Sequence, residues 1–353
     1  MKIFVTGGGG FLGLAIVRQL LAQGHEVVTF SRRSHPALQQ LGITHHLGDL
    51  SDYTLLKKAM INSEAVFHVA AKTGIWGKYN DFYRTNVTGT ENVVRACREL
   101  GIRYLVFTSS PSVVYQGKNS EGQNESLPYL KKYDAYYPQT KAIAEKLVMA
   151  ANNELLKTVS LRPHLIWGPE DPHFLPRLFE KSKAGKLRIL GNSPNLVDCI
   201  YIDNAAKAHV DAFAQLLHDP ATVEGKTYFI SQGAPIPIAE FINQLLATGE
   251  FPPVTKRLSP TIARIAGRVL ETTYRAFGLT KEPPITLFLA RQLSTSHWYD
   301  ISAAKKDFQY NAGVSLETGM ERLRGWVTAM NTLDQFTSND HGSFKNFACT
   351  NKA

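Results

Sequence analysis

A run of glycines directly after the first apolar segment limits what this chain can fold into more than any other feature. Residues 2–6 have the composition of a buried strand, and Thr6–Gly13 contains the spacing Gly-x-Gly-x-x-Gly before a helical pattern that continues to Leu21. A second strand pattern follows at Glu26–Phe30, which makes a β-α-β unit. Glycine permits positive φ in a tight turn and lets a pyrophosphate approach the helix N-terminus. A glycine cluster can also be a flexible turn, but this position predicts a dinucleotide site formed by Gly7, Gly10 and Gly13.

The end of the second strand indicates which dinucleotide is bound. An NAD site is expected to place an acidic residue there for the ribose 2′-hydroxyl, whereas this chain has Ser31-Arg32-Arg33. A hydroxyl and guanidinium groups suit the 2′-phosphate of NADP(H), so we predict that cofactor, with Ser31 and Arg32 as its contacts. The alternative is that the two arginines are solvated loop residues. Asp49, after the third strand, could accept from the adenine amino group or could cap a helix.

Strands and helices alternate along the first half of the chain. Strand patterns are expected near 44–47, 65–69, 104–108, 158–162 and 227–230, with helices from Asp52, around Asn86–Leu100 and after Tyr137. This alternation predicts an α/β fold, a Rossmann-type doubly wound parallel sheet with a smaller, interleaved C-terminal substrate lobe. We expect residues 1–168 to form the NADP-binding domain, rejoined by 196–232. Residues 169–195 and 233–332 are expected to form the substrate lobe.

The candidate catalytic residues lie at Tyr137 and Lys141. Their Tyr-x-x-x-Lys spacing puts both side chains on one helix face, where the cation can stabilise a phenolate. A surface tyrosine and a solvated lysine would have the same spacing by chance. Ser110 follows the strand 104–108 at the ligand-binding edge of the sheet and could hydrogen-bond a substrate carbonyl. Pro111 restricts Ser110 to extended geometry, so Ser112 is the alternative serine.

Composition and charge exclude several classes of function. The 353-residue chain has no apolar run long enough for a membrane span, so we expect a cytoplasmic protein. Its three cysteines, Cys97, Cys199 and Cys349, are widely spaced, which predicts reduced thiols and no metal site. The net charge of +9 comes from scattered basic residues, and we expect no nucleic-acid partner.

Two C-terminal segments have distinctive patterns. Within residues 259–278, an apolar set recurs at helical spacing with arginines on other faces, and it consists of Ile262, Ile265, Val269 and Leu270. This basic amphipathic helix either packs on its own lobe or docks on a membrane surface or partner. The polar segment 334–353 is expected to be a disordered tail.

The chain resembles the extended short-chain dehydrogenase/reductases, in their 3β-hydroxysteroid dehydrogenase branch, across roughly residues 1–330. The resemblance rests on these segments: Thr6–Gly13, Gly48–Leu50, His68–Ala71, Asn86–Thr90, Thr108–Ser110, Tyr137–Lys141, Leu161–Pro163, Ile166–Pro169 and Tyr201–Asn204. It implies a ketoreductase in which Tyr137 donates a proton, Lys141 also binds the nicotinamide ribose, and Tyr201–Asn204 forms a structural clasp. The cofactor contacts that it and the motifs predict are Gly7, Gly10, Phe11, Leu12, Gly13, Ser31, Arg32, Asp49, Leu50, Ala70, Ala71, Tyr137, Lys141 and Pro163.

Four further segments are similar to the β-keto-acid reductases of bacterial long-chain olefin biosynthesis: Ala71–Gly77, Leu196–Asp203, Tyr228–Ser231 and His297–Asp300. This likeness implies a substrate with long alkyl chains, a homo-oligomer, and a complex with thiolase-like and β-lactone synthetase enzymes. The alternatives are a sterol dehydrogenase, a sugar-nucleotide epimerase or dehydratase of the same fold, and a non-catalytic NADP-sensing protein.

Overall fold

The computed structural model describes residues 1–191 and 194–338, with side chains to residue 332, and its largest element is a seven-stranded parallel sheet. The strand order is β12-β7-β5-β4-β1-β2-β3 and reverses direction between β1 and β4. The strands are β1 (Lys2–Thr6), β2 (Glu26–Ser31), β3 (Thr44–Leu47), β4 (Ala65–His68), β5 (Tyr104–Thr108), β7 (Lys157–Pro163) and β12 (Lys226–Ile230). The predicted Rossmann-type sheet is therefore confirmed. A reversal of this kind opens a ligand crevice at the carboxyl ends of the strands.

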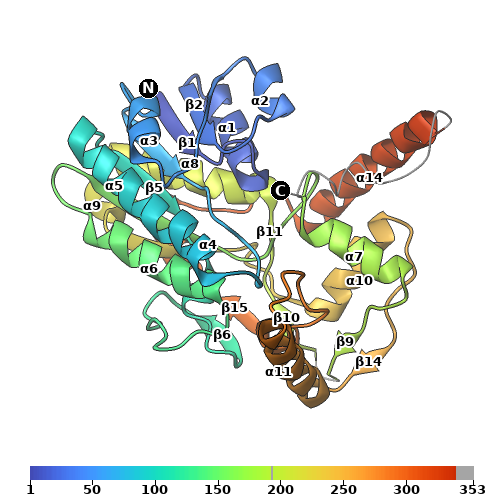
Figure 1. The fold of residues 1–353 in the computed structure, drawn as a ribbon. Coiled ribbons are helices and arrows are strands. Elements are labelled where there is room, and N and C mark those ends of the chain that lie inside the picture. Colours follow the sequence, from blue (N-terminus) through green and yellow to red (C-terminus); the bar gives the residue numbers. More distant parts are fainter. Residues whose placement is uncertain (192–193, 339–353) are drawn as a thin grey trace.

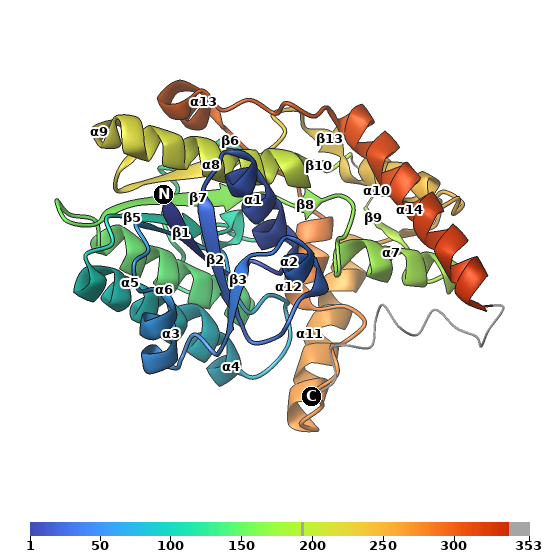
Figure 2. The ribbon, with the colours of Figure 1, turned by 90° about the horizontal axis from the view of Figure 1, so that it is seen from above.

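Helices cover both faces of this sheet (Figures 1 and 2). One face carries α3 (Tyr53–Ala59), α4 (Tyr79–Tyr83), α5 (Gly89–Leu100) and α6 (Tyr136–Ala150). The other carries α1 (Phe11–Ala22) and α8 (Ile202–His218), beside α9 (Pro220–Val223) and α13 (Ser302–Phe308), while α2 (Pro36–Gln40) lies between β2 and β3. Successive residues of β1 show why both faces are apolar: Ile3 and Val5 belong to one core cluster, and Phe4 belongs to the other.

The helix expected at Asn86–Leu100 differs from its prediction. Residues Arg84–Thr88 form a π-helical turn between α4 and α5, so Asn86 lies before the regular helix. The helix of the Tyr-x-x-x-Lys segment begins at Tyr136, whereas it was expected to begin after Tyr137. Both changes concern one or two turns and leave the predicted order of elements intact.

The remaining elements form the smaller lobe. Its helices are α7 (Phe174–Lys183), α10 (Ile238–Thr248), α11 (Pro260–Ala276), α12 (Leu287–Leu293) and α14 (Leu316–Ser338). A four-stranded sheet has the order β13 (Ile236–Pro237), β10 (Leu196–Val197), β15 (His297–Tyr299) and β6 (Ser120–Gln123), and β9 (Ile189–Leu190) pairs with β14 (Arg257–Leu258). Since β6 belongs to the first half of the chain, the lobe is attached to the Rossmann part by a strand pairing as well as by connections.

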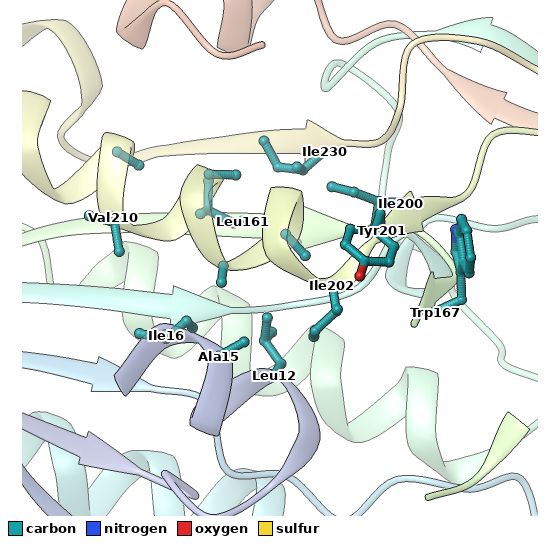
Figure 3. Close-up of a cluster of buried hydrophobic side chains, with 14 of the residues drawn as sticks. Leu12, Ala15, Ile16, Leu161, Trp167, Ile200, Tyr201, Ile202, Val210 and Ile230 are labelled. Atoms are coloured by element: carbon teal, nitrogen blue, oxygen red, sulfur yellow. The ribbon is translucent and has the colours of Figure 1, made fainter. Parts of the chain in front are cut away.

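A short parallel pairing connects the main sheet to this lobe. β8 (Ile166–Trp167) pairs with β11 (Ile200–Tyr201), and the Trp167 and Tyr201 rings meet edge to face at 5.3 Å. Figure 3 shows both rings beside Ile202, at the point where α8 begins, with Leu12 and Ala15 of α1 below. Gly168 has φ +149°, and a Cβ there would lie 2.6 Å from Ile202. The backbone must therefore turn at a glycine where the two parts of the molecule meet.

The amphipathic segment 259–278 forms α11, which projects from the lobe (Figures 1 and 2). It packs through Ala263 and Gly267, whereas Ile262, Ile265 and Val269 are each more than half exposed. The helix therefore packs on its own lobe, as one of the two interpretations expected, but it does so through Ala263 and Gly267, and the stripe of Ile262, Ile265 and Val269 is left exposed.

The structure also bears on the C-terminal segment, the cysteines and the length of the helices. Helix α14 includes residues 334–338 of the segment expected to be disordered, and 339–353 lie outside the described residues. Cys97 and Cys199 are buried free thiols, while Cys349 is outside the described residues. No helix within the described parts of the chain has the length and apolar character needed to cross a bilayer.

A buried ion pair fixes α6 against the main sheet. Arg162 on β7 donates to both carboxylate oxygens of Glu145 on α6, at 2.7 and 3.0 Å. Tyr129 and Ser160 donate to the same carboxylate at 2.6 and 3.1 Å. Neither charged side chain is more than 2% exposed. Because the carboxylate is satisfied on several sides, its charge can be held in the interior.

We expect Arg162→Met to lower the free energy of unfolding by about 3–5 kcal/mol, because Glu145 would remain buried without its counter-charge. The double variant Glu145→Leu/Arg162→Met should recover most of this loss, since no charge is left unpaired. Urea unfolding followed by circular dichroism measures both. A double variant no more stable than Arg162→Met alone would contradict this account.

Candidate active site

The glycine turn joins β1 to α1 at the point where the strand order reverses. Gly7 has φ +69°, and a Cβ at Gly7 would lie 2.9 Å from the Ala70 Cα. A Cβ at Gly13 would lie 2.1 Å from the Gly7 carbonyl oxygen. The first helical hydrogen bond runs from Leu14 N to Gly10 O, and no side chain caps α1. The amides of Phe11, Leu12 and Gly13 therefore point out of the helix without helical acceptors, which fits a bound phosphate.

A hydrogen-bonded threonine holds the neighbouring loop beside this turn. Thr6 Oγ1 accepts from the amides of Val69 and Ala70, each at 3.1 Å, and lies 2.7 Å from His68 Nδ1. His68 Nε2 in turn lies 2.9 Å from Thr90 Oγ1. Burial lowers the pKa of His68 to about 3, so the ring is neutral. The segment Ala70–Ala71 is thereby fixed at the end of β4, against the glycine turn.

The predicted adenosine end lies at β2 and β3. Ser31 donates to the Arg33 carbonyl at 2.8 Å, and Arg32 is exposed to solvent. His45, which the sequence did not single out, lies 3.3 Å from the Ser31 hydroxyl and 3.0 Å from the Arg33 carbonyl. These contacts order the turn in which the arginines lie.

Asp49 does not cap a helix. Its carboxylate accepts from the amide and hydroxyl of Ser51, at 2.9 and 2.8 Å, and pairs with Arg84 at 3.1 Å. The cap of α3 is Asp52, which accepts from Leu55 N at 3.0 Å. Burial opposes ionisation, but the bonds from Ser51 still hold the pKa of Asp49 below its ordinary value. Leu50 is buried in the core.

Three of the predicted side chains meet at the carboxyl end of β5. The Ser110 hydroxyl lies close enough to the Tyr137 phenol to lower the pKa of that phenol. Lys141 donates to the Thr108 carbonyl at 2.6 Å, and its ammonium lies 4.1 Å from the centre of the Phe107 ring. Ser110 is extended, with φ −159° and ψ 144°, as Pro111 requires. Ser112 lies behind it, with its hydroxyl 2.9 Å from that of Ser110. Of the two candidate serines, Ser110 is the one that acts on the pKa of the phenol.

Burial sets the protonation of this group. It raises the pKa of Tyr137, although the nearby Ser110 hydroxyl acts in the opposite direction, so the phenol keeps its proton at neutral pH. Burial also lowers the pKa of Lys141 to about 7, although Glu145 one turn along α6 acts in the opposite direction. The lysine can therefore change its charge near neutral pH.

A cavity of about 100 Å³ adjoins these residues. It is lined by Ser110, Pro111, Ser112, Tyr115, Pro163, His164, Leu165, Gln292, His297 and Tyr299. Pro163, predicted to be a cofactor contact, lies at the end of β7 and lines the same cavity as Ser110. A larger hollow of about 360 Å³ lies within the lobe near Arg257 and contains none of the predicted site residues.

Asn86 connects the cofactor side of the site to the tyrosine helix. Its side chain accepts from Lys72 N at 2.7 Å, and donates to the Lys72 carbonyl at 3.1 Å and to Thr140 Oγ1 at 3.0 Å. Thr140 lies between Tyr137 and Lys141 on α6. The sequence contained Asn86 only as part of a family segment, because nothing in its neighbourhood indicates a partner 54 residues away.

Comparison with known proteins agrees with this geometry. The model of the 3-beta hydroxysteroid dehydrogenase/isomerase family matches residues 4–254. A 2-alkyl-3-oxoalkanoate reductase of Shewanella oneidensis is 48% identical, covering 91% of this chain and 85% of the relative. A second 2-alkyl-3-oxoalkanoate reductase, from Stenotrophomonas maltophilia, is 47% identical, covering 92% of this chain and 98% of the relative. The UDP-glucose 4-epimerase structure from Thermotoga maritima has a TM-score of 0.73 at 18% identity, over 94% of this chain and all of that one, which shows the shared fold.

The fold and these relatives define an oxidoreductase that acts on CH–OH and C=O groups, and they support a nicotinamide cofactor. The chain belongs to the 3-beta hydroxysteroid dehydrogenase/isomerase family. The predicted family resemblance is confirmed.

We expect Lys141→Met to stabilise the protein while it removes the buried ammonium. The pKa of Lys141 is lowered from 10.5 to about 7, so between these values the unfolded chain binds more protons and wild-type stability rises with pH. The gain in unfolding free energy should be on the order of a few kcal/mol below pH 7 and vanish above pH 10.5.

Thermal unfolding across this pH range measures the effect. Lys146→Met, which removes an exposed lysine from the same helix, is the matched control and should show no such trend. An equal pH dependence of stability in both variants would overturn the account of Lys141.

Proposed function

We propose that the chain reduces the 3-oxo group of a 2-alkyl-3-oxoalkanoate to the 3-hydroxy acid with NADPH. The convergence of Ser110, Tyr137 and Lys141 at the end of β5, on the same edge of the parallel sheet as the glycine turn, carries this proposal, because a carbonyl there has a hydrogen-bond donor and an acid within reach. The two bacterial relatives are named for this substrate class. Their identity to this chain extends over both the sheet and the lobe that lines the cavity.

In the proposed reaction, Ser110 donates a hydrogen bond to the substrate carbonyl oxygen and polarises it. A bound nicotinamide supplies a hydride to the carbonyl carbon. The Tyr137 phenol, protonated at neutral pH, gives its proton to the carbonyl oxygen, which becomes the product hydroxyl. Lys141 in its charged form stabilises the phenolate that remains. The glycine turn, with its three open amides, would hold the pyrophosphate of the cofactor.

The preference for NADP rests on the end of β2. Ser31 and Arg32 occupy the place where a carboxylate would favour NAD, and the Arg32 side chain is exposed toward solvent. Its charge also acts on the carboxyl of Asp49 at the end of β3. A guanidinium at this position can pair with a 2′-phosphate, whereas a 2′-hydroxyl gains little from it.

Tyr137→Phe should lower kcat for reduction of a 2-alkyl-3-oxo acid by about 10²–10⁴-fold, because the proton donor is lost while the ring is kept. NADPH absorbance, followed with 2-alkyl-3-oxo acids, sterol ketones and UDP-sugars, measures the rates. Tyr136→Phe, the same change one residue earlier, should keep most of the activity. Full activity of Tyr137→Phe, or turnover of a sterol or UDP-sugar but of no 2-alkyl-3-oxo acid, would refute the proposal.

Arg32→Ala should weaken NADPH binding by about tenfold or more and leave NADH binding nearly unchanged, because one charge-assisted contact to the 2′-phosphate is lost. Fluorescence titration of both cofactors gives the two dissociation constants. Arg98→Ala, near the C-terminal end of α5, provides the control for loss of one positive charge. The same loss of affinity for NADH and NADPH would show that Arg32 does not distinguish them.

A further inference from the structure

Two buried histidines from distant parts of the chain meet in the wall of the cavity. His164 follows β7 and His297 begins β15, and their facing nitrogens, Nε2 and Nδ1, lie 3.0 Å apart. The outer nitrogens both face backbone carbonyls: His164 Nδ1 lies 2.7 Å from Asp198 O, and His297 Nε2 lies 2.9 Å from Gln292 O. The rings are 7% and 3% exposed, and both line the cavity beside Ser110.

These contacts require three protons on two rings. A carbonyl oxygen can only accept, so each outer nitrogen must carry a hydrogen. A neutral imidazole has only one N–H, which leaves two lone pairs facing each other across the 3.0 Å contact. If one ring instead carries its hydrogen on the inner nitrogen, its outer nitrogen faces a backbone carbonyl without a proton to donate. His68 has no such conflict, because its two partners are threonine hydroxyls that can donate as well as accept.

The buried surroundings of the two histidines disfavour binding of the third proton. Burial lowers the pKa of His164 to about 3 and that of His297 to about 4. The nearest titratable rings are Tyr115 and Tyr299, whose pKa values burial raises, so both are neutral. The Asp198 carboxylate is occupied by Ser231 and the amides of Gly233 and Ala234. Arg162, which acts on Tyr299, is paired with Glu145.

The cavity lining itself offers no anion to the pair and no other cation to a ligand. Its ten residues include no Asp, Glu, Lys or Arg. An anion that enters this cavity would therefore stabilise a positive charge on the histidine pair. Among the lining residues, these two histidines are the ones that can become positively charged by taking up a proton.

We propose that the His164–His297 pair recognises the carboxylate of the substrate and takes up one proton as that carboxylate binds. The inference rests on the proposed function, because it is the acid group of a 3-oxo acid that enters. One carbon separates that carboxylate from the carbonyl, so both groups can lie in one small cavity, which Ser110, Ser112 and the two histidines all line. The pair thus selects an acid over the corresponding ketone or ester.

The sign of the pH dependence follows from this uptake. Without a ligand the pair is neutral at neutral pH, and a bound carboxylate raises its pKa. The substrate carboxylate stays ionised above about pH 5. Affinity for the acid should therefore fall by up to about tenfold per unit as pH rises from 6 to 8. The methyl ester of the same compound should bind with no such dependence.

Calorimetry of the full chain with NADP and a 2-alkyl-3-hydroxy acid, the stable product, tests the proposal. Titrations in buffers of different ionisation enthalpy give the number of protons bound. We expect about one proton per acid and none per methyl ester. His297→Gln should abolish the uptake, because an amide can satisfy the inner contact without an added proton. His209→Gln, a buried histidine whose partners are the Thr108 hydroxyl and the Ala205 carbonyl, should leave it unchanged.

Binding of the acid by the wild-type protein without proton uptake would overturn the proposal, whatever the variants do. So would equal pH dependence for acid and ester. The proposed function is tested separately by the NADPH assay. If that function is wrong, no 2-alkyl-3-oxo acid is reduced there, whatever the calorimetry shows.

Discussion

The ion pair between Glu145 and Arg162 is the interaction on which the geometry of the site depends. Glu145 lies one turn after Lys141 and two turns after Tyr137, so its attachment to β7 sets the rotation and height of α6 against the sheet. Burial lowers the pKa of Lys141, and Glu145 keeps that pKa from falling further. Several donors surround this one carboxylate, so a shift of α6 would leave the buried charge without them and would be costly.

A second set of hydrogen bonds makes the cofactor loops and the tyrosine helix one unit. It runs from Thr6 through His68 and Thr90 to Asn86, and from there to Lys72 and Thr140. Each member is polar and buried or half-buried, so an unmatched partner would be costly. A continuous chain of hydrogen bonds thereby joins the strand before the glycine turn to α6, the helix that carries Tyr137.

The sequence predicted those features that depend on local pattern, and it missed those made by partners distant in the chain. The order of strands and helices follows from apolar periodicity, and Ser110, Tyr137 and Lys141 meet because a strand end and one helix face place them together. No local signal could pair His164 with His297, which are 133 residues apart, or bring β6 into the lobe sheet. The sequence could not predict that the apolar stripe of α11 is exposed, because periodicity identifies an apolar face and not what covers it. The family resemblance indicated a substrate class that periodicity alone does not contain.

Lys141 and the histidine pair share one physical property. Each is a basic group whose charged form is disfavoured by burial, although each lies where an anion is expected: a developing phenolate for the lysine and a carboxylate for the histidines. A group that stayed charged without its partner would destabilise the folded protein and would attract water or a stray anion into the cavity. If the charge appears only with the ligand, part of the binding free energy depends on the correct ligand being an anion. Selectivity for an acid then arises from protonation equilibria of buried groups, and the site needs no permanently charged residue in its lining.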